Sequence, residues 1–120
     1  MKLRFIASFV FAIMLITALT VLHAAHAQNS PTRIEIIAKR FDFTPADITV
    51  RKGQPVVLAL KSVDAAHGLR FTELGIEVKV DKGQIGQIAF APDKIGDFVG
   101  QCSVFCGSGH GRMKLTLHVE

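Results

Sequence analysis

The sequence contains no tryptophan, no tyrosine and only two cysteines in its 120 residues. Two cysteines are too few for a disulfide-stapled secreted scaffold, and the length allows one domain rather than several. No GxGxxG or P-loop string is present, which excludes the common glycine-rich nucleotide folds. No Ser-His-Asp set and no paired carboxylates suggest hydrolysis. These absences leave a small single-domain protein, and its chemistry has to come from a few residues.

Hydrophobic residues make up 49% of the chain, and many of them lie near the N-terminus. Residues 5–22 form an uncharged, largely apolar run, preceded by Lys2 and Arg4 and followed by an Ala-x-Ala triplet that ends at Ala27. This pattern predicts a signal peptide over residues 1–27. The alternative is an uncleaved membrane anchor, since the run is near the lower limit for spanning a bilayer. Either way, residues 28–120 form a periplasmic or otherwise extracytoplasmic domain, which meets a membrane only if the segment is uncleaved.

The charge of this domain is small. Removing Lys2 and Arg4 lowers the formal net charge from +4 to +2. Such a charge gives no reason to expect nucleic acid or an anionic membrane as the partner. A domain of this length buries only a modest core, so a metal or a disulfide would help to stabilise it.

The domain is predicted to be all-β. Apolar and polar residues alternate in several short segments, which are separated by Gly, Pro and Asp signals. Residues 62–68 interrupt the pattern and are expected to form a loop. Seven or eight strands at this spacing favour a β-sandwich or small barrel of antiparallel sheets. The expected strands cover residues 33–39 with a continuation through Phe43, then 47–51, 55–60, 69–71, 76–80, 84–90, 97–101 and 114–119.

Residues 101–113, QCSVFCGSGHGRM, concentrate the residues with metal-binding chemistry. Cys102, Cys106, His110 and Met113 follow one another as Cys-x3-Cys, Cys-x3-His and His-x2-Met. Alternating glycines allow a tight loop that directs these side chains to one point. Thiolate, imidazole and thioether together are ligands that copper prefers, whereas calcium and magnesium would need carboxylates. Zinc uses Cys and His but rarely a thioether.

A copper site of this kind needs a second histidine. His67 lies in the predicted loop, and loops distant in sequence can meet at one end of a sandwich. His118 is a poorer candidate, because it alternates with the apolar face of the last strand and points the other way. Taken singly, the two cysteines could form a plain disulfide, His67 could be a surface histidine and Met113 could be a core residue. The four closely spaced residues together favour a metal site.

These residues resemble the binuclear copper A (CuA) loop of cytochrome c oxidase subunit II and nitrous-oxide reductase. The family pattern Cys-x-x-x-Cys-x-x-x-His-x-x-Met, with one upstream histidine, is similar to Cys102, Cys106, His110 and Met113 with His67. Residues 96–101 and 63–68 resemble the family segments that flank these ligands. The resemblance covers most of residues 33–120 and implies a cupredoxin-like Greek-key β-sandwich, preceded by the N-terminal signal or anchor helix.

The resemblance also implies the role of each residue. Cys102 and Cys106 would bridge two copper ions, and His67 and His110 would each bind one. Met113 and the backbone carbonyl of Val104 would be weak axial ligands. Val104 stands where the family has Glu, so the carbonyl remains but the Glu side chain's contact with a second metal is lost. The single N-terminal segment and the lack of Trp and Tyr favour a free-standing cupredoxin over a core oxidase subunit.

Such a protein would carry electrons and would not itself be an enzyme. Its partner would be a c-type cytochrome, a terminal oxidase or a copper-accepting protein. Two alternatives stay open: a mononuclear blue-copper carrier with one copper ion, and a chaperone or storage protein that delivers copper. We further expect Phe98 and Phe105 to shield the site from water.

Overall fold

The computed structural model describes residues 10, 14 and 30–120. The predicted signal peptide, residues 1–27, therefore lies outside the described residues except at positions 10 and 14. Within the described part of the chain, no helix is both long and apolar enough to cross a membrane. The remaining description concerns Pro31–Glu120, which forms one structural unit.

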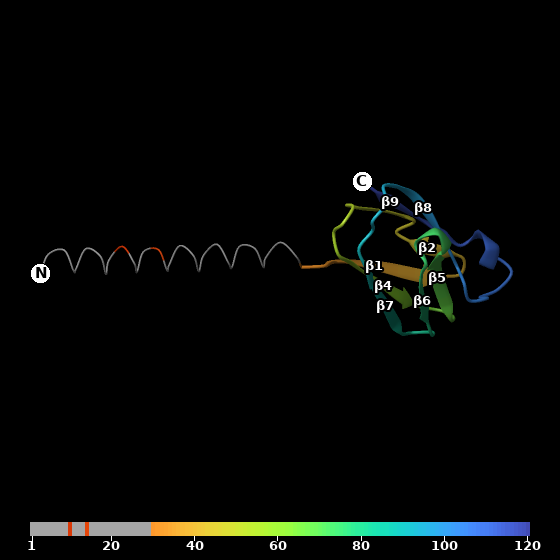
Figure 1. Cartoon of the computed structure of the whole chain (residues 1–120). Coiled ribbons are helices and arrows are strands. Elements are labelled where there is room, and N and C mark those ends of the chain that lie inside the picture. The colour runs from red at the N-terminus through yellow and green to blue at the C-terminus, as the bar shows by residue number, and fades with distance from the viewer. Residues whose placement is uncertain (1–9, 11–13, 15–29) are drawn as a thin grey trace, which may run out of the picture. The chain divides into compact units, whose positions relative to one another are not determined.

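Two β-sheets face each other in this unit (Figure 1). The first sheet has the order β2-β1-β4-β7 and the second has the order β3-β9-β8-β5-β6. Two short 3-10 helices complete the described secondary structure. The elements are β1 (Thr32–Lys39), β2 (Asp42–Thr44), β3 (Asp47–Val50), β4 (Val56–Ser62), β5 (His67–Phe71), η1 (Thr72–Leu74), β6 (Ile76–Val80), β7 (Ile85–Phe90), β8 (Gly96–Gln101), η2 (His110–Arg112) and β9 (Lys114–Val119).

The hydrophobic core lies between the sheets and follows the sequence pattern. In β9, Leu115, Leu117 and Val119 are buried while the residues between them are at least partly exposed, as period-2 alternation requires. In contrast, β4 is an inner strand between β1 and β7, and its apolar run is buried almost throughout. The predicted all-β sandwich is thus confirmed.

Three details of the predicted fold were wrong. The described residues contain nine strands, because Phe43 does not continue β1: the chain turns at residues 40–41, and β2 pairs back on β1 with Ala38 opposite Phe43. The sheets are not wholly antiparallel, since β1 runs parallel to β4 and β3 runs parallel to β9. Finally, the predicted loop over residues 62–68 is shorter, because Ser62 ends β4 and His67 begins β5.

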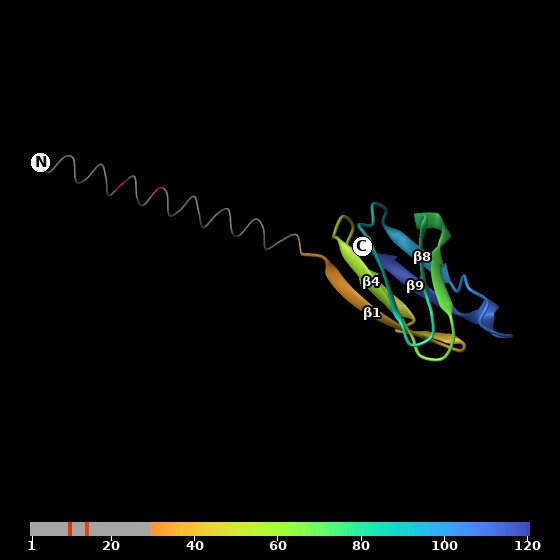
Figure 2. The same ribbon diagram turned by 90° about the horizontal axis from the view of Figure 1, so that it is seen from below.

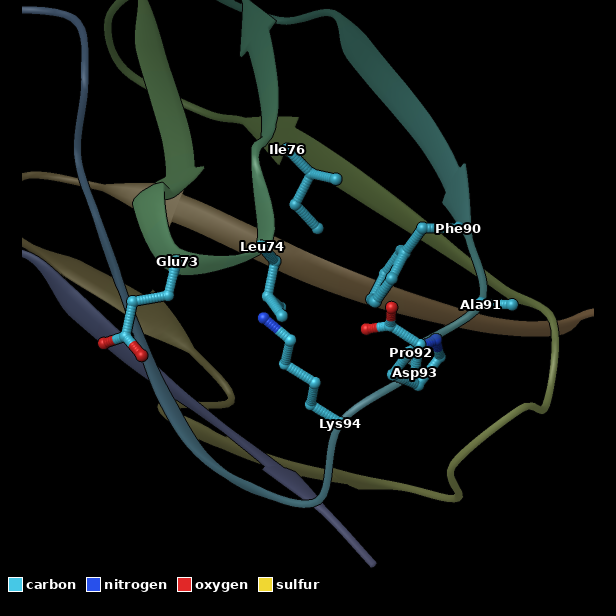
Figure 3. A pocket seen from close by; sticks show the side chains of 8 residues that line it. All are labelled: Glu73, Leu74, Ile76, Phe90, Ala91, Pro92, Asp93 and Lys94. Carbon is cyan, nitrogen blue, oxygen red and sulfur yellow. The ribbon is translucent and has the colours of Figure 1, made fainter.

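The two ends of the sandwich differ in chemistry. The segment between β8 and β9 projects from one end, away from the C-terminus, as Figures 1 and 2 show. At the other end, a pocket of about 260 Å³ lies between η1 and the segment that follows β7 (Figure 3). The Lys94 side chain extends across this pocket toward Leu74. Its lining contains neither His nor Cys, so the metal-binding chemistry belongs to the first end.

Candidate metal centre

The two cysteines lie side by side as free thiols. Their sulfur atoms are 3.9 Å apart, far beyond the disulfide bond length of about 2.05 Å. Cys102 is 7% exposed and Cys106 is 4% exposed. The Cys102 amide donates to the Met113 carbonyl, which closes the loop that carries both cysteines, and the Ser103 amide donates to the Gly68 carbonyl, which fixes this loop to β5. In the structure the two cysteines are therefore buried free thiols and do not form the disulfide that the sequence left open.

His67 faces the first of these thiols. Its Nδ1 lies 4.0 Å from the Cys102 sulfur, and the residue is completely buried at the start of β5. The short connection from β4 is closed by the Ser62 hydroxyl, which donates to the Ala65 carbonyl. The burial of His67 agrees with a role inside the protein rather than with a surface loop histidine.

Asp64 sets the orientation of the His67 ring. The Nε2 atom of His67 lies 2.8 Å from an Asp64 carboxylate oxygen. Since an ionised carboxylate only accepts hydrogen bonds, Nε2 donates to Asp64, and Nδ1 is the ring nitrogen that faces Cys102. Burial opposes ionisation of Asp64, but hydrogen bonds from the Arg40 amide and the His67 ring outweigh it and lower the pKa of this carboxyl. Asp64 thus stays ionised and holds the ring with Nδ1 toward Cys102.

His110 and Met113 face the second thiol. The Nδ1 atom of His110 lies 4.0 Å from the Cys106 sulfur, and the Met113 sulfur lies 3.4 Å from the same atom. His110 begins η2 and is partly exposed, whereas Met113 is 1% exposed. The carbonyl of Val104 also faces the site, because it lies 3.2 Å from the Cys102 sulfur. All the residues expected from the sequence are therefore at one end of the sandwich.

The arrangement fits a soft metal ion. The donor atoms of His67, Cys102 and Cys106 all lie within 4.8 Å of one another. Thiolate and imidazole bonds to zinc, a comparable first-row metal, are about 2.3 Å and about 2.0 Å long. One ion can therefore touch both sulfur atoms, or a sulfur atom and its neighbouring ring, at the observed separations. Two thiols, imidazoles and a thioether in a largely buried site are the donors that copper favours.

The pKa of Cys106 shows what metal binding has to overcome. Burial, together with the neighbouring Cys102 thiol, raises the pKa of Cys106 to about 11. In the metal-free protein this thiol is therefore protonated at neutral pH, and a metal ion must displace the proton to bind the thiolate.

Sequence reasoning missed the turn between β1 and β2. The Arg40 Nε atom donates a hydrogen bond of 2.6 Å to the Cys106 carbonyl, and the Arg40 amide donates one of 2.7 Å to Asp64. The Phe41 ring lies directly against the loop: an added Cβ atom would collide with it at Gly109 and would be tightly packed against it at Gly107. This turn thus supports both halves of the site, although no local motif marks it.

The structure does not place either phenylalanine as a shield of the site. Phe98 is 6% exposed and belongs to the hydrophobic core. Phe105 is 78% exposed, because it lies on the outer side of the short loop between the two cysteines. Phe105 therefore does not bury the site.

His118 lies away from the cluster, as the alternation of β9 indicated. Its Nδ1 lies 2.6 Å from Asp97 and its Nε2 lies 3.2 Å from Asp47. Both ring nitrogens are occupied by carboxylates of the neighbouring strands, so His118 joins β3, β9 and β8 across the outer face of the second sheet.

We expect this histidine to make stability depend on pH. Hydrogen bonds that the His118 ring donates to Asp97 and then to Asp47 raise the pKa of His118 above its ordinary value of 6.5. A raised folded-state pKa adds stability that is complete below pH 6.5 and disappears as pH rises through the folded value. In urea unfolding of the metal-free protein, His118→Asn should thus cost more stability at about pH 5.5 than at about pH 9. A pH-independent difference would contradict this role.

A two-sheet sandwich with Cys, His and Met donors at one end defines a cupredoxin-type domain. A profile described as the cupredoxin-like domain matches residues 11–115, and the chain belongs to this family. Cytochrome c oxidase subunit 2 of Thermus thermophilus is 28% identical over 98 residues, which cover 80% of this chain and 73% of that protein. The same subunit of Myxine glutinosa is 30% identical over 98 residues, which cover 82% of this chain and 40% of that protein.

The fold is similar to solved oxidase domains. The periplasmic domain of cytochrome oxidase subunit II of Bradyrhizobium japonicum superposes with a TM-score of 0.68 at 18% identity, covering 74% of this chain and 83% of that one. At this identity the likeness shows the fold alone. The chain is thus homologous to oxidase subunit II sequences, and the expected family resemblance is confirmed.

Proposed function

We propose that this domain binds copper and carries electrons, without being an enzyme itself. The cluster would hold two copper ions, which Cys102 and Cys106 bridge. Each ion would have one histidine, and weaker ligands would complete the site. The proposed ligands are His67, Cys102, Val104 through its carbonyl, Cys106, His110 and Met113.

One observation carries this proposal: each thiol faces the other thiol and also its own imidazole. Cys102 lies 3.9 Å from Cys106 and 4.0 Å from His67, while Cys106 lies 4.0 Å from His110. A mononuclear blue-copper site would use only one of the two thiols and would leave the other buried beside it without a role. The paired arrangement instead supports two half-sites, each with its own imidazole, that would share both sulfur atoms.

The protein's own residues would keep the site rigid. Copper supplies a one-electron couple between Cu(I) and Cu(II). Asp64 fixes the His67 ring, Arg40 fixes the Cys106 carbonyl, and backbone hydrogen bonds close the loop at Met113 and join it to β5. Donors held in place in this way need little rearrangement when the charge of the site changes, and burial keeps water from the sulfur atoms.

The relatives suggest where the protein works. Homology to oxidase subunit II supports an extracytoplasmic location, which agrees with a signal peptide over residues 1–27 or with an uncleaved anchor. A c-type cytochrome or a terminal oxidase would then be the electron partner. A copper-accepting protein would be the partner only if the domain delivers copper.

Redox cycling separates these functions. The copper-loaded protein is reduced and reoxidised repeatedly in the presence of a strong Cu(I) chelator, and bound copper is measured after each cycle. An electron carrier should retain its copper and a constant optical spectrum. Progressive loss of copper to the chelator, without a reversible couple, would instead support copper delivery and contradict electron transfer.

Copper binding should strengthen with pH. The Cys106 thiol has a pKa of about 11, so binding at neutral pH releases at least its proton. The apparent Cu(I) affinity should consequently rise at least about tenfold per pH unit between about pH 6 and about pH 9. Competition with a chromophoric Cu(I) chelator, corrected for the chelator's own pH dependence, measures this slope. A flat profile would show that Cys106 does not bind as a thiolate.

Removing the Asp64 carboxylate should weaken copper binding while the ligands stay in place. Asp64→Ala frees the His67 ring to rotate and to exchange tautomers, and loss of such an outer-shell partner typically costs about 10- to 100-fold in metal affinity. Asp42→Ala is the matched control, because Asp42 is an exposed carboxylate on β2 that, among the residues that the structure describes, makes no hydrogen bond to His67 or to the cysteines. Equal affinities of the two variants would show that Asp64 does not orient the ring.

A further inference from the structure

The outer surface of the metal loop carries an exposed aromatic ring. Phe105 is 78% exposed although it stands between the two buried cysteines. Its ring packs against the His110 ring in a tilted arrangement, with 5.7 Å between the ring centroids and 47° between the planes. The His110 ring in turn lies next to the Cys106 sulfur. An apolar contact point on the surface is therefore only one side chain away from the candidate centre.

Cationic side chains lie on the loop that carries this ring, and on the strand and the turn next to it. Arg112 and Lys114 are exposed at the end of the same loop, and Arg40 reaches over the loop to the Cys106 carbonyl. The Arg112 guanidinium lies 6.0 Å from the centroid of the Phe41 ring. This ring packs against Gly109 of the loop. We call Arg40, Arg112 and Lys114 the basic rim.

The nearby carboxylates do not cancel this charge. Residues 101–113 contain neither Asp nor Glu. The Asp64 carboxylate accepts hydrogen bonds from the His67 ring and from the Arg40 amide, so it faces the metal site. Asp42 lies opposite Lys39 in the β1–β2 hairpin. The loop that bears Phe105 therefore carries a cationic side chain and no carboxylate, while Glu77, which contacts Ser103 of the loop, is itself paired with Arg70 and Lys79.

We infer that Phe105 and the basic rim form a docking surface for a partner protein that presents carboxylates around an apolar spot. The inference rests on the proposed function, because electrons would cross this surface. A basic rim attracts an acidic face and repels a basic one, which sets both the orientation and the rate of encounter. Phe105 would supply the apolar contact at the centre, where aromatic residues contribute most of the binding energy.

Binding to two redox proteins of opposite charge tests this surface. The metal-free full chain is tethered for biolayer interferometry and is exposed to an acidic plant-type ferredoxin and to a basic cytochrome c. We expect ferredoxin to bind more tightly, and we expect its affinity to fall when added salt shortens the Debye length from about 30 Å to about 8 Å. Tighter binding of cytochrome c, or binding that salt does not weaken, would overturn the inference.

Variants locate the surface. Arg112→Glu should lower the on-rate for ferredoxin about tenfold at low salt, and Phe105→Ser should weaken its affinity about tenfold. Arg51→Glu is the matched control, because Arg51 is an exposed arginine that follows β3 at the opposite end of the sandwich. Equal losses in Arg51→Glu and Arg112→Glu would mean that only net charge matters, which would overturn the assignment to this surface.

Anionic vesicles provide the remaining comparison. If vesicles of phosphatidylglycerol and phosphatidylcholine bind the full chain, and Phe105→Ser abolishes that binding while ferredoxin binding is unchanged, the surface is a membrane contact and the inference is wrong. Because all these binding measurements use metal-free protein, their results do not depend on copper. If the protein loses its copper during redox cycling but still binds ferredoxin, the proposed electron transfer is rejected and the docking surface is retained.

Discussion

Replacing either cysteine by serine should abolish the copper centre. Both sulfur atoms would bridge the two ions, so Cys102→Ser and Cys106→Ser each remove a ligand from both half-sites at once. The loss in copper affinity should exceed the about 10- to 100-fold typical of outer-shell substitutions. Serine keeps nearly the same shape at these buried positions, so the metal-free fold should persist. Copper per chain and the optical spectrum after loading measure the result.

The two substitutions together distinguish the binuclear site from the mononuclear alternative. In a blue-copper site built from His67, Cys106, His110 and Met113, the Cys102 thiol is dispensable. Cys102→Ser would then retain one copper ion and an intense blue band, whereas Cys106→Ser would lose both. Equal loss in both variants supports the shared bridge, and retention of a blue centre in Cys102→Ser would contradict it.

A single methyl group at Gly109 should disrupt both the loop and the centre. The Cβ atom of Gly109→Ala would collide with the Phe41 ring, which the β1–β2 turn holds beneath the loop. Overpacking of this kind typically costs about 1–3 kcal/mol. Because Gly109 directly precedes His110, the displaced loop should also weaken copper binding. Urea unfolding of the metal-free protein and Cu(I) competition measure the two effects.

Gly111→Ala is the matched control for this prediction, since no heavy atom lies within 4 Å of the position of its added Cβ. It should change neither stability nor copper affinity appreciably. In a Phe41→Ala background the ring is absent, so the cost of Gly109→Ala should shrink to nearly nothing. If Gly109→Ala costs as much in that background as in the wild-type protein, contact with Phe41 is not the cause.

The contrast between these residues shows what the sequence can disclose about the site. Cys102, Cys106, His110 and Met113 are close in sequence, so their spacing alone indicates a common centre. His67 is more distant, yet a cupredoxin pattern requires a histidine in that loop. Arg40 and Phe41 reach the loop only because β1 and β2 turn back beneath it, and no local spacing encodes that contact.

The same distinction applies to the fold. Strict alternation marks β9, and a continuous apolar run marks the inner strand β4, because burial dictates both patterns. The hairpin at residues 40–41 was missed, since Phe41 and Phe43 preserve the alternation across the turn. Parallel pairing of β1 with β4 was also missed, because residue pattern specifies which face is buried and not which strand lies alongside.

Electron-spin resonance of the copper-loaded full chain, combined with copper analysis, tests the binuclear centre most directly. We expect two copper ions per chain and a hyperfine pattern in which one unpaired electron is shared equally between two copper nuclei. In Cys102→Ser and Cys106→Ser this pattern should be absent. One copper ion per chain, with the hyperfine pattern of a single nucleus, would contradict the account.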